Sequence, residues 1–458
     1  MKNIFLSIGL ATVICSSAQN LSETTNRLIE VNRAVNRASE WSKESALEAK
    51  KIDSSKLVKK TITQEIALPK ALDVLIDMSG ELSINTWNEN KIKIETTVQF
   101  EAPNEFTDTQ WFDKLGINMK LFGGTVKVKS KPNNGITYVS GTGTKTIFSA
   151  SPIFYNSGTY FNIQKQPVTL YIPAESILEI ESKSGYLKIK NNIKSLMLDN
   201  SDGEIEFANI EKLQIRSNRG SFSGGIVAEA DVELSYARFS LKQLNKGVVT
   251  SNYSTIEIES LKDVKLSSSN DEIDIDNVST LYGIKNYGNL RINELAGKLD
   301  LQGVNSDIKL RHINSSAQLI KIINRNADLR LSTNNLSNFS VDIKGSYNKV
   351  YSSFAENTTV DTLTAGEIES VKTLTNPATT VNPAVRGFGT TNSQYTNAER
   401  ALVANIERVL PNNVVTISGY GLGGNKQNPY LKYSAKIGTG NASLKYQVIC
   451  TSCTIDFK

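Results

Sequence analysis

Apolar and polar residues alternate in short runs that return at a nearly fixed interval along the middle of the chain. Each run opens with an apolar residue, another residue and a second apolar residue. The step between runs is 17 or 18 residues up to residue 308 and 21 residues beyond it. Alternation over a few positions is typical of β-strands, and a second short run follows each pair, so each repeat is predicted to hold two strands. The first residues of the pairs are Leu187, Ile205, Phe222, Phe239, Ile256, Ile273, Leu290, Ile308, Leu329 and Val350.

The polar positions between the strands follow the same interval. Asn and Ser suit tight corners, because their side chains bond local backbone groups and Asn tolerates a positive φ. Several columns in one register predict that the repeats stack on one another. The corner residues are Ser201, Asn218, Ser235, Asn252, Ser269 and Asn286, and the residues after them are Asp202, Arg219, Tyr236, Tyr253, Asn270 and Tyr287.

A repeat of this length cannot bury its apolar face alone, whereas stacked repeats form one continuous core. Stacking also pairs parallel strands at ~4.8 Å per rung. We therefore predict an all-β fold, a parallel β-solenoid or β-helix with rungs of about 17 residues over residues 181–352, plus short flanking helices. The ends of such a stack need caps, since open strand edges pair with other chains.

The N-terminus has the pattern of a secretory signal. Lys2 precedes an apolar run at 4–14, and Ser16 and Ala18 provide the small residues of a cleavage site. Residues 1–18 are therefore predicted to be a signal peptide, and the mature chain is expected in the periplasm, on the outer surface or secreted. The run is too short for a transmembrane helix, and none is expected elsewhere.

The flanks of the repeats are less regular. Residues 19–55 form a predicted amphipathic helical segment, which either covers an end of the solenoid or binds a partner. Residues 56–180 are predicted to be an irregular β region that leads into the solenoid and carries an insertion at 102–166. Residues 353–458 are predicted to be an irregular tail with a short helix at 397–410 and terminal strands.

Two segments resemble a known group of proteins. The segment from Leu75 to Ile94 with Trp87, and repeats such as Ser201–Phe207, are similar to those of the bacterial putative-adhesin β-strand-repeat families. The resemblance covers roughly residues 70–350. It implies an exported β-solenoid protein of uncharacterised function, without established catalytic residues.

The charge balance excludes some partners. The chain has 51 basic and 46 acidic residues and a net charge of +5, which is too even to predict nucleic-acid binding. Hydrophobic residues make up 39% and charged residues 21%, as in ordinary folded domains.

Cys450 and Cys453 remain after removal of the predicted signal peptide, which contains Cys15. Their C-x-x-C spacing lies among strand-forming residues rather than at the start of a helix, so a structural disulfide is favoured over free thiols or a redox pair. A lipoprotein signal, in which Cys15 would carry the lipid, is the alternative. Such signals prefer a small residue before the cysteine, whereas this chain has Ile14.

The sequence contains little that indicates catalysis. His312 is the one histidine, which excludes metal sites with several histidines, and no metal or cofactor is predicted. The glycine pattern at 419–424 is followed by a turn instead of the helix that a dinucleotide site needs. Glu257 and Asp274 are expected as neighbours on the outside, either as a glycosidase-like carboxylate pair or as part of a solvated charge ladder.

Two outward columns are candidates for ligand binding. Arg291, Lys309 and Arg330 form a basic column that suits an anionic glycan. The second column contains Tyr236, Tyr253 and Tyr287, whose rings suit stacking against sugars. Solubility and corner packing explain both columns equally well at this point.

These features favour an exported, non-enzymatic scaffold for binding or adhesion at the cell surface or in the periplasm, with a glycan or a surface protein as partner. A β-helix enzyme that acts on polysaccharides is the alternative from another class. A purely structural component of the cell envelope is the third hypothesis.

Overall fold

The computed structural model describes residues 57–375 and 429–458, except for short gaps. The predicted signal peptide, the segment 19–55, the helix at 397–410 and the glycine pattern at 419–424 lie outside the described residues. The gaps are 69–72, 79, 102–105, 131–135, 141–142, 148–152, 157–158, 163–166, 183–184, 201, 355–356 and 440.

The chain divides into two compact units. The smaller unit contains two antiparallel hairpins, β7 (Ile136–Ser140) with β8 (Gly143–Ile147) and β9 (Ile153–Asn156) with β10 (Thr159–Asn162). The larger unit, formed by Ile62–Thr96, Asp108–Pro132 and Pro167–Lys458, contains the repeats.

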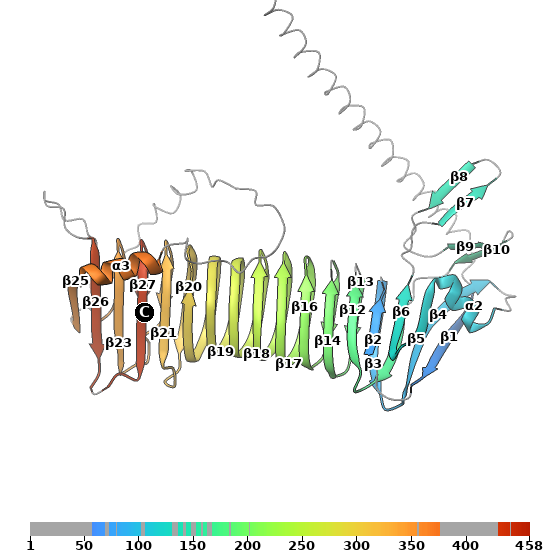
Figure 1. Cartoon of the computed structure of the whole chain (residues 1–458), viewed down its shortest axis with the longest axis horizontal. Helices are drawn as coiled ribbons and strands as arrows, with labels where there is room; N and C mark the ends of the chain where they lie inside the picture. Colours follow the sequence, from blue (N-terminus) through green and yellow to red (C-terminus); the bar gives the residue numbers. More distant parts are fainter. Residues whose placement is uncertain are drawn as a thin grey trace, which may run out of the picture. The chain divides into compact units, whose positions relative to one another are not determined.

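The larger unit is a stack of rungs with strands on two faces (Figure 1). β17 (Gly220–Ser235), β18 (Ala237–Asn252) and β19 (Thr255–Gln302) run around corners and contribute strands to both faces. The first face also contains β3 (Gly80–Trp87), β13 (Gly185–Ile189), β15 (Glu204–Phe207), β20 (Ser306–Ile313) and β22 (Asp328–Leu331). The second face also contains β2 (Asp73–Asp77), β12 (Ile177–Ser182), β14 (Ile193–Asn200), β16 (Ile210–Ser217) and β21 (Leu319–Arg325).

The predicted apolar columns are register partners in parallel strands. Leu187 pairs with Ile205, which pairs with Phe222, and the same column continues through Phe239 to Ile256. All five side chains are buried, so the rungs share one continuous apolar core. The prediction of an all-β solenoid with short helices is confirmed.

The C-terminal rungs are not in the order that the sequence spacing predicts. Leu329 and Val350 are expected as neighbours, but Leu329 pairs with Ile455 and Ile455 pairs with Val350. The last described strands, β27 (Leu444–Thr451) and β28 (Thr454–Phe457), lie between β21–β22 and the rung of β23 (Phe339–Ser346) and β24 (Lys349–Tyr351). Spacing along the chain cannot reveal a rung that arrives from about 100 residues away.

Antiparallel strands follow the parallel ladder at both ends of the second face. β26 (Tyr430–Ile437) pairs with β23, and β25 (Thr358–Thr362) pairs with β26, beside α3 (Ala365–Leu374). At the other end β6 (Thr125–Ser130) pairs with β2 and with β5 (Ile117–Phe122), which α2 (Asp108–Leu115) contacts. These additions cover the edges that a parallel stack leaves open.

The segment before the repeats contributes to the first face. β3 pairs in parallel with β13 on one side and with β11 (Val168–Pro173) on the other. β11 pairs in turn with β4 (Lys91–Glu101), in an antiparallel direction. β1 (Leu57–Ala67) also pairs with β4. The first solenoid rung in chain order is therefore formed by β2 and β3. None of the described helices is long and apolar enough to span a membrane.

Candidate functional site

One corner of each successive rung is held by a residue in the left-handed αL region. φ is 52° at Tyr236, 51° at Tyr253, 59° at Asn270 and 52° at Tyr287. The N–H groups of corner residues donate hydrogen bonds to the next rung of the stack. These bonds show that the corners after Tyr287 are, in order, those of Asn305, Asn326, Ser452 and Tyr347. Asn tolerates this conformation, whereas a bulky residue in it is an outlier.

The predicted tyrosine column is present but interrupted. The rings of Tyr236 and Tyr253 are stacked, with centroids 5.1 Å apart and planes 4° from parallel. Tyr287 is two rungs further, because Asn270 occupies the corner between them. The three side chains are 61%, 51% and 44% exposed, and we refer to Tyr236, Tyr253 and Tyr287 as the tyrosine ladder.

Backbone preference does not account for tyrosine at these corners. An αL conformation costs about 1–2 kcal/mol for a residue with a Cβ atom. Asn occupies the equivalent corner in three other rungs, and a ring that stays half exposed returns little burial energy. Strained backbone that supports exposed aromatic rings is typical of a binding site.

The predicted basic column is also present. Arg291 pairs with Lys309 and Lys309 with Arg330 across parallel strands of the first face. Arg291 forms an ion pair with Asp274 at 3.2 Å, and Arg330 forms one with Asp328 at 3.2 Å. Two of the three cations are therefore partly neutralised, which weakens the column as an anion site.

The carboxylates that the sequence singled out form a surface charge ladder. Asp274 is paired with Arg291, and both side chains are about half exposed, while Glu257 lies exposed one repeat away. A similar pair on the same face, Lys188 with Glu206 at 2.6 Å, holds the pKa of Glu206 below its usual value. Among the described residues no cluster of three His, Cys, Asp or Glu side chains is arranged to hold a metal, and His312 is exposed.

A buried polar network lies behind the αL corners, and the sequence did not indicate it. Asp271 is 0% exposed, and its carboxylate accepts hydrogen bonds from the Ser251 and Ser268 hydroxyls, both at 2.6 Å. It also accepts from the N–H groups of Ser254 at 2.6 Å and Ser269 at 3.1 Å. The carboxylate thus ties its own corner to that of the preceding rung.

Lys285 adds a cation to the same region. Its side chain is 1% exposed, and its Nζ donates to the backbone oxygens of Asp271, at 3.1 Å, and of Tyr287. Burial lowers the pKa of Lys285 from 10.5 to about 8, although the nearby Asp271 carboxylate acts in the opposite direction.

This shift predicts an unusual pH dependence of stability. Between pH 8 and 10.5 the unfolded chain keeps the Lys285 proton while the folded chain has released it, so the free energy of unfolding rises with pH. From pH 8 to pH 10 we expect a gain of about 2 kcal/mol from this residue. Urea unfolding at both pH values measures it, and Lys285→Met should lack the gain; an equal slope in the variant would refute the assignment.

The two cysteines close another αL corner. Cys450 and Cys453 form a disulfide around Ser452, whose φ is 59°, and both are buried. The Asn348 side chain donates to the Cys450 carbonyl at 2.7 Å and accepts from the Cys453 N–H at 3.0 Å. The disulfide therefore closes the corner of the inserted rung, and the Asn348 side chain connects that corner to the neighbouring rung.

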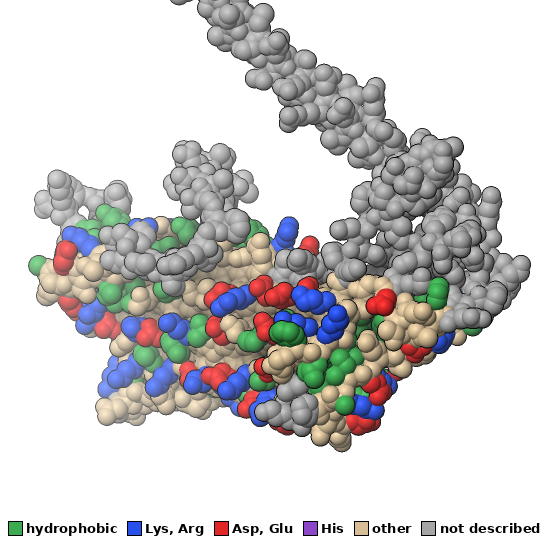
Figure 2. All heavy atoms as spheres, turned by 45° about the vertical axis from the view of Figure 1, so that its right-hand side comes forward, with side chains coloured by type: hydrophobic (Ala, Val, Ile, Leu, Met, Phe, Trp, Pro, Cys, Tyr) green, Lys and Arg blue, Asp and Glu red, His purple; other side chains and the backbone are tan. Residues whose placement is uncertain are grey.

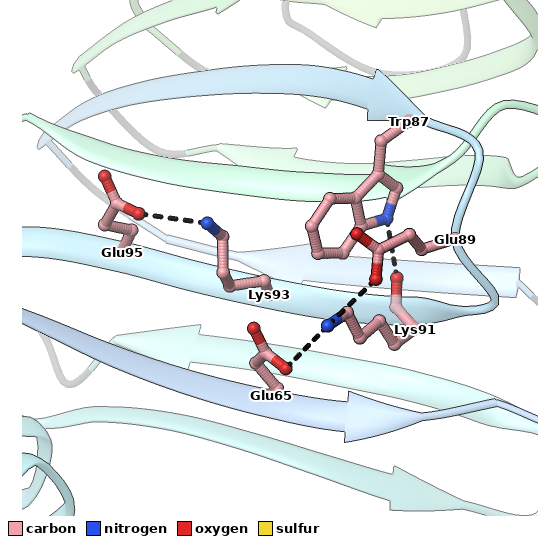
Figure 3. Close-up of polar contacts among 6 residues, drawn as sticks. All are labelled: Glu65, Trp87, Glu89, Lys91, Lys93 and Glu95. Atoms are coloured by element: carbon pink, nitrogen blue, oxygen red, sulfur yellow. Dashed lines mark hydrogen bonds and ion pairs between the residues drawn. The ribbon is translucent and has the colours of Figure 1, made fainter.

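Trp87 lies among paired lysines and glutamates at the N-terminal end of the first face (Figure 3). Its indole N–H donates to the Lys91 carbonyl at 2.8 Å, and the Lys91 ammonium lies 2.9 Å from both Glu65 and Glu89. The hydrogen bonds that the Lys91 ammonium donates to Glu89 and then to Glu65 raise the pKa of Lys91. Lys93 lies 5.6 Å from the Trp87 ring and pairs with Glu95, so paired lysines line the indole ring.

A family model described as Toastrack DUF4097 matches residues 76–375 and confirms the resemblance that the repeats indicated. Comparison with the curated proteins finds no match. Among solved structures, the chain is similar to a putative adhesin from Parabacteroides distasonis, with 10% identity and a TM-score of 0.34 over 58% of this chain and 96% of the other. A putative lipid binding protein from the same species has 14% identity and a TM-score of 0.30, over 59% of this chain and 96% of the other. A putative adhesin from Parabacteroides merdae has 13% identity and a TM-score of 0.28, over 58% and 96%.

Proposed function

The chain belongs to the Toastrack DUF4097 family, and we propose that it is an exported, non-enzymatic scaffold that binds an extended glycan along the tyrosine ladder. The signal-peptide pattern of residues 1–18 supports export. The solenoid supports an extended ligand, because its surface repeats at each rung.

The observation that carries the proposal is the strained, exposed set of tyrosines. Tyr236 and Tyr253 present stacked rings one rung apart, and Tyr287 repeats the arrangement two rungs further on. Aromatic rings are flat apolar surfaces with a polar hydroxyl at one end, and they lose little conformational entropy on binding. Sugar rings also present flat apolar faces, and a glycan repeats them along its length.

The alternatives are less well supported. A polysaccharide-cleaving enzyme requires a general acid. Asp274 is a poor candidate for this role, because it forms an ion pair with Arg291 on the exposed surface of a strand. A structural envelope component would not require tyrosine at αL corners, where Asn serves in other rungs.

An incubation of the mature chain with a panel of soluble polysaccharides separates these hypotheses. The amount of polysaccharide retained on immobilised protein and the oligosaccharides released into solution are both measured. The scaffold proposal predicts retention without release. Release that disappears in Glu257→Gln or Asp274→Asn would establish the enzyme instead, and the absence of both would favour the structural component.

Replacing Tyr236, Tyr253 and Tyr287 together by Asn is expected to abolish retention without unfolding the chain. Relief of the αL conformation, about 1 kcal/mol per residue, offsets the lost ring stacking of about 0.5–1.5 kcal/mol. Retention and urea unfolding are measured on the same variant. Tyr347→Asn is the matched control, because Tyr347 is an exposed αL tyrosine four rungs beyond Tyr287. Equal loss in the control would count against the ladder.

A further inference from the structure

The second face carries a shallow hollow that the tyrosine ladder does not use. Its volume is about 440 Å³, and residues of β14, β16, β17, β18 and β19 line it. It begins at Met197 and ends at Tyr282, five repeats further along the stack. At ~4.8 Å per rung, the hollow is a trough of about 24 Å that runs across the strands.

Small residues mark the middle of the trough. The inward row along its floor contains Leu196, Leu213, Ala230 and Gly247 as successive register partners. A Cβ atom at Gly247 would lie 2.5 Å from the Ala230 carbonyl oxygen, so the two backbones approach each other closely there. The floor of the trough is therefore the backbone of this inward row, and the outward side chains on either side of the row form its walls.

One wall of the trough has alternating charge. Lys212, Glu229, Lys246 and Asp263 follow one another in register, and all four are exposed. Rows of basic and acidic side chains are visible on the surface in Figure 2. Elsewhere such neighbours pair, as Arg291 does with Asp274, but none of these four forms an ion pair with another described residue.

The opposite wall mixes apolar and polar side chains, since Gln214 and the exposed Asp231 lie between Met197 and Val248 in the register. Met197, Val248 and Tyr282 are 36%, 40% and 42% exposed, and each lines the trough. The trough therefore combines apolar side chains that are exposed to water with hydrated charges of both signs that form no ion pair within the described residues. A neutral glycan would leave the charges unpaired, and a polyanion would be repelled by Glu229 and Asp263.

We propose that the trough binds an extended peptide segment of about seven residues in which apolar and charged residues alternate. An extended chain rises about 3.3 Å per residue, so seven residues span the trough. Successive side chains point to opposite sides, so one edge of the peptide contacts Met197, Val248 and Tyr282. The other edge carries acidic and basic residues that meet Lys212, Glu229, Lys246 and Asp263.

A random twelve-residue peptide display library tests this proposal on the full mature chain. Wild-type protein is expected to enrich peptides that alternate apolar residues with charges of both signs. Binding of the best synthetic peptide, measured by fluorescence polarisation, should weaken about tenfold in Lys246→Glu and in Val248→Asp, because each tenfold change corresponds to one lost contact of about 1.4 kcal/mol. Both side chains are exposed, and a thermal melt of each variant checks the fold.

The exposed Lys436 on β26 provides the control variant Lys436→Glu, which should bind like wild type. A peptide with its matching acidic residue changed to Lys should recover binding to Lys246→Glu. Enrichment of no peptide, of purely basic or purely acidic peptides, or of peptides that bind all variants equally would overturn the proposal. The tyrosine ladder is a separate surface, so loss of glycan retention does not affect this result.

Discussion

Replacing Asp271 by alanine is expected to lower the free energy of unfolding by about 3–5 kcal/mol. The substitution removes the acceptor of four hydrogen bonds, from the hydroxyls of Ser251 and Ser268 and the N–H groups of Ser254 and Ser269. All of these bonds are in a corner where Asp271 is 0% exposed, so water cannot replace the carboxylate without opening the rungs. Lys285 also loses its nearby opposite charge.

Urea unfolding at pH 7 measures this loss. Asp274→Ala is the matched control, since Asp274 lies on the same strand but is about half exposed in a surface ion pair with Arg291. Such pairs contribute at most about 1 kcal/mol. If Asp271→Ala cost no more than Asp274→Ala, the buried network would not be a determinant of stability.

Replacing Val448 by Asp is expected to cost about 4–5 kcal/mol and to disrupt the C-terminal rungs. Val448 is 0% exposed and pairs with Ile322 on one side and Ile343 on the other, so the new carboxylate would have no partner in an apolar core. The effect depends on the insertion of β27 between β21 and β23. A terminal strand outside the core would tolerate the change.

Gln447→Asp controls for this substitution, because the adjacent side chain is exposed and a charge there should change stability by no more than about 0.5 kcal/mol. The two variants are compared by urea unfolding and by hydrogen exchange of β21 and β23. Equal behaviour of the two variants would contradict the inserted rung.

The repeat was predictable because the same side-chain requirement returns at every rung. Leu187, Ile205 and Phe222 each fill the same position of the core, and a period in the sequence is enough to align them. The tyrosine column was predictable for the same reason, as a set of positions one repeat apart. The αL backbone of these tyrosines was less evident from the sequence, since the one indication is that Asn270 occupies the same column.

Contacts that do not follow the 17-residue repeat were not predictable from the sequence. Leu329 and Val350 are one apparent repeat apart, yet Ile455 separates them, and no local pattern marks so distant a partner. Asp271 is the first residue of the acidic run at 271–276, a pattern that suggests an outward strand, but it lies at a corner and turns inward towards Ser251 and Ser254 of the preceding rung. The trough was missed because it is formed by stacked strands together, with an inward row as its floor and outward side chains of neighbouring rungs as its walls.

Hydroxyl-radical footprinting, with and without a polysaccharide that the chain retains, tests the proposed glycan site most directly. Mass spectrometry reports the modification of each tyrosine. Binding along the ladder predicts protection of Tyr236, Tyr253 and Tyr287 and unchanged modification of Tyr347, which has the same αL backbone and a comparable exposure. Unchanged modification of the three ladder tyrosines, or equal protection of Tyr347, would contradict it.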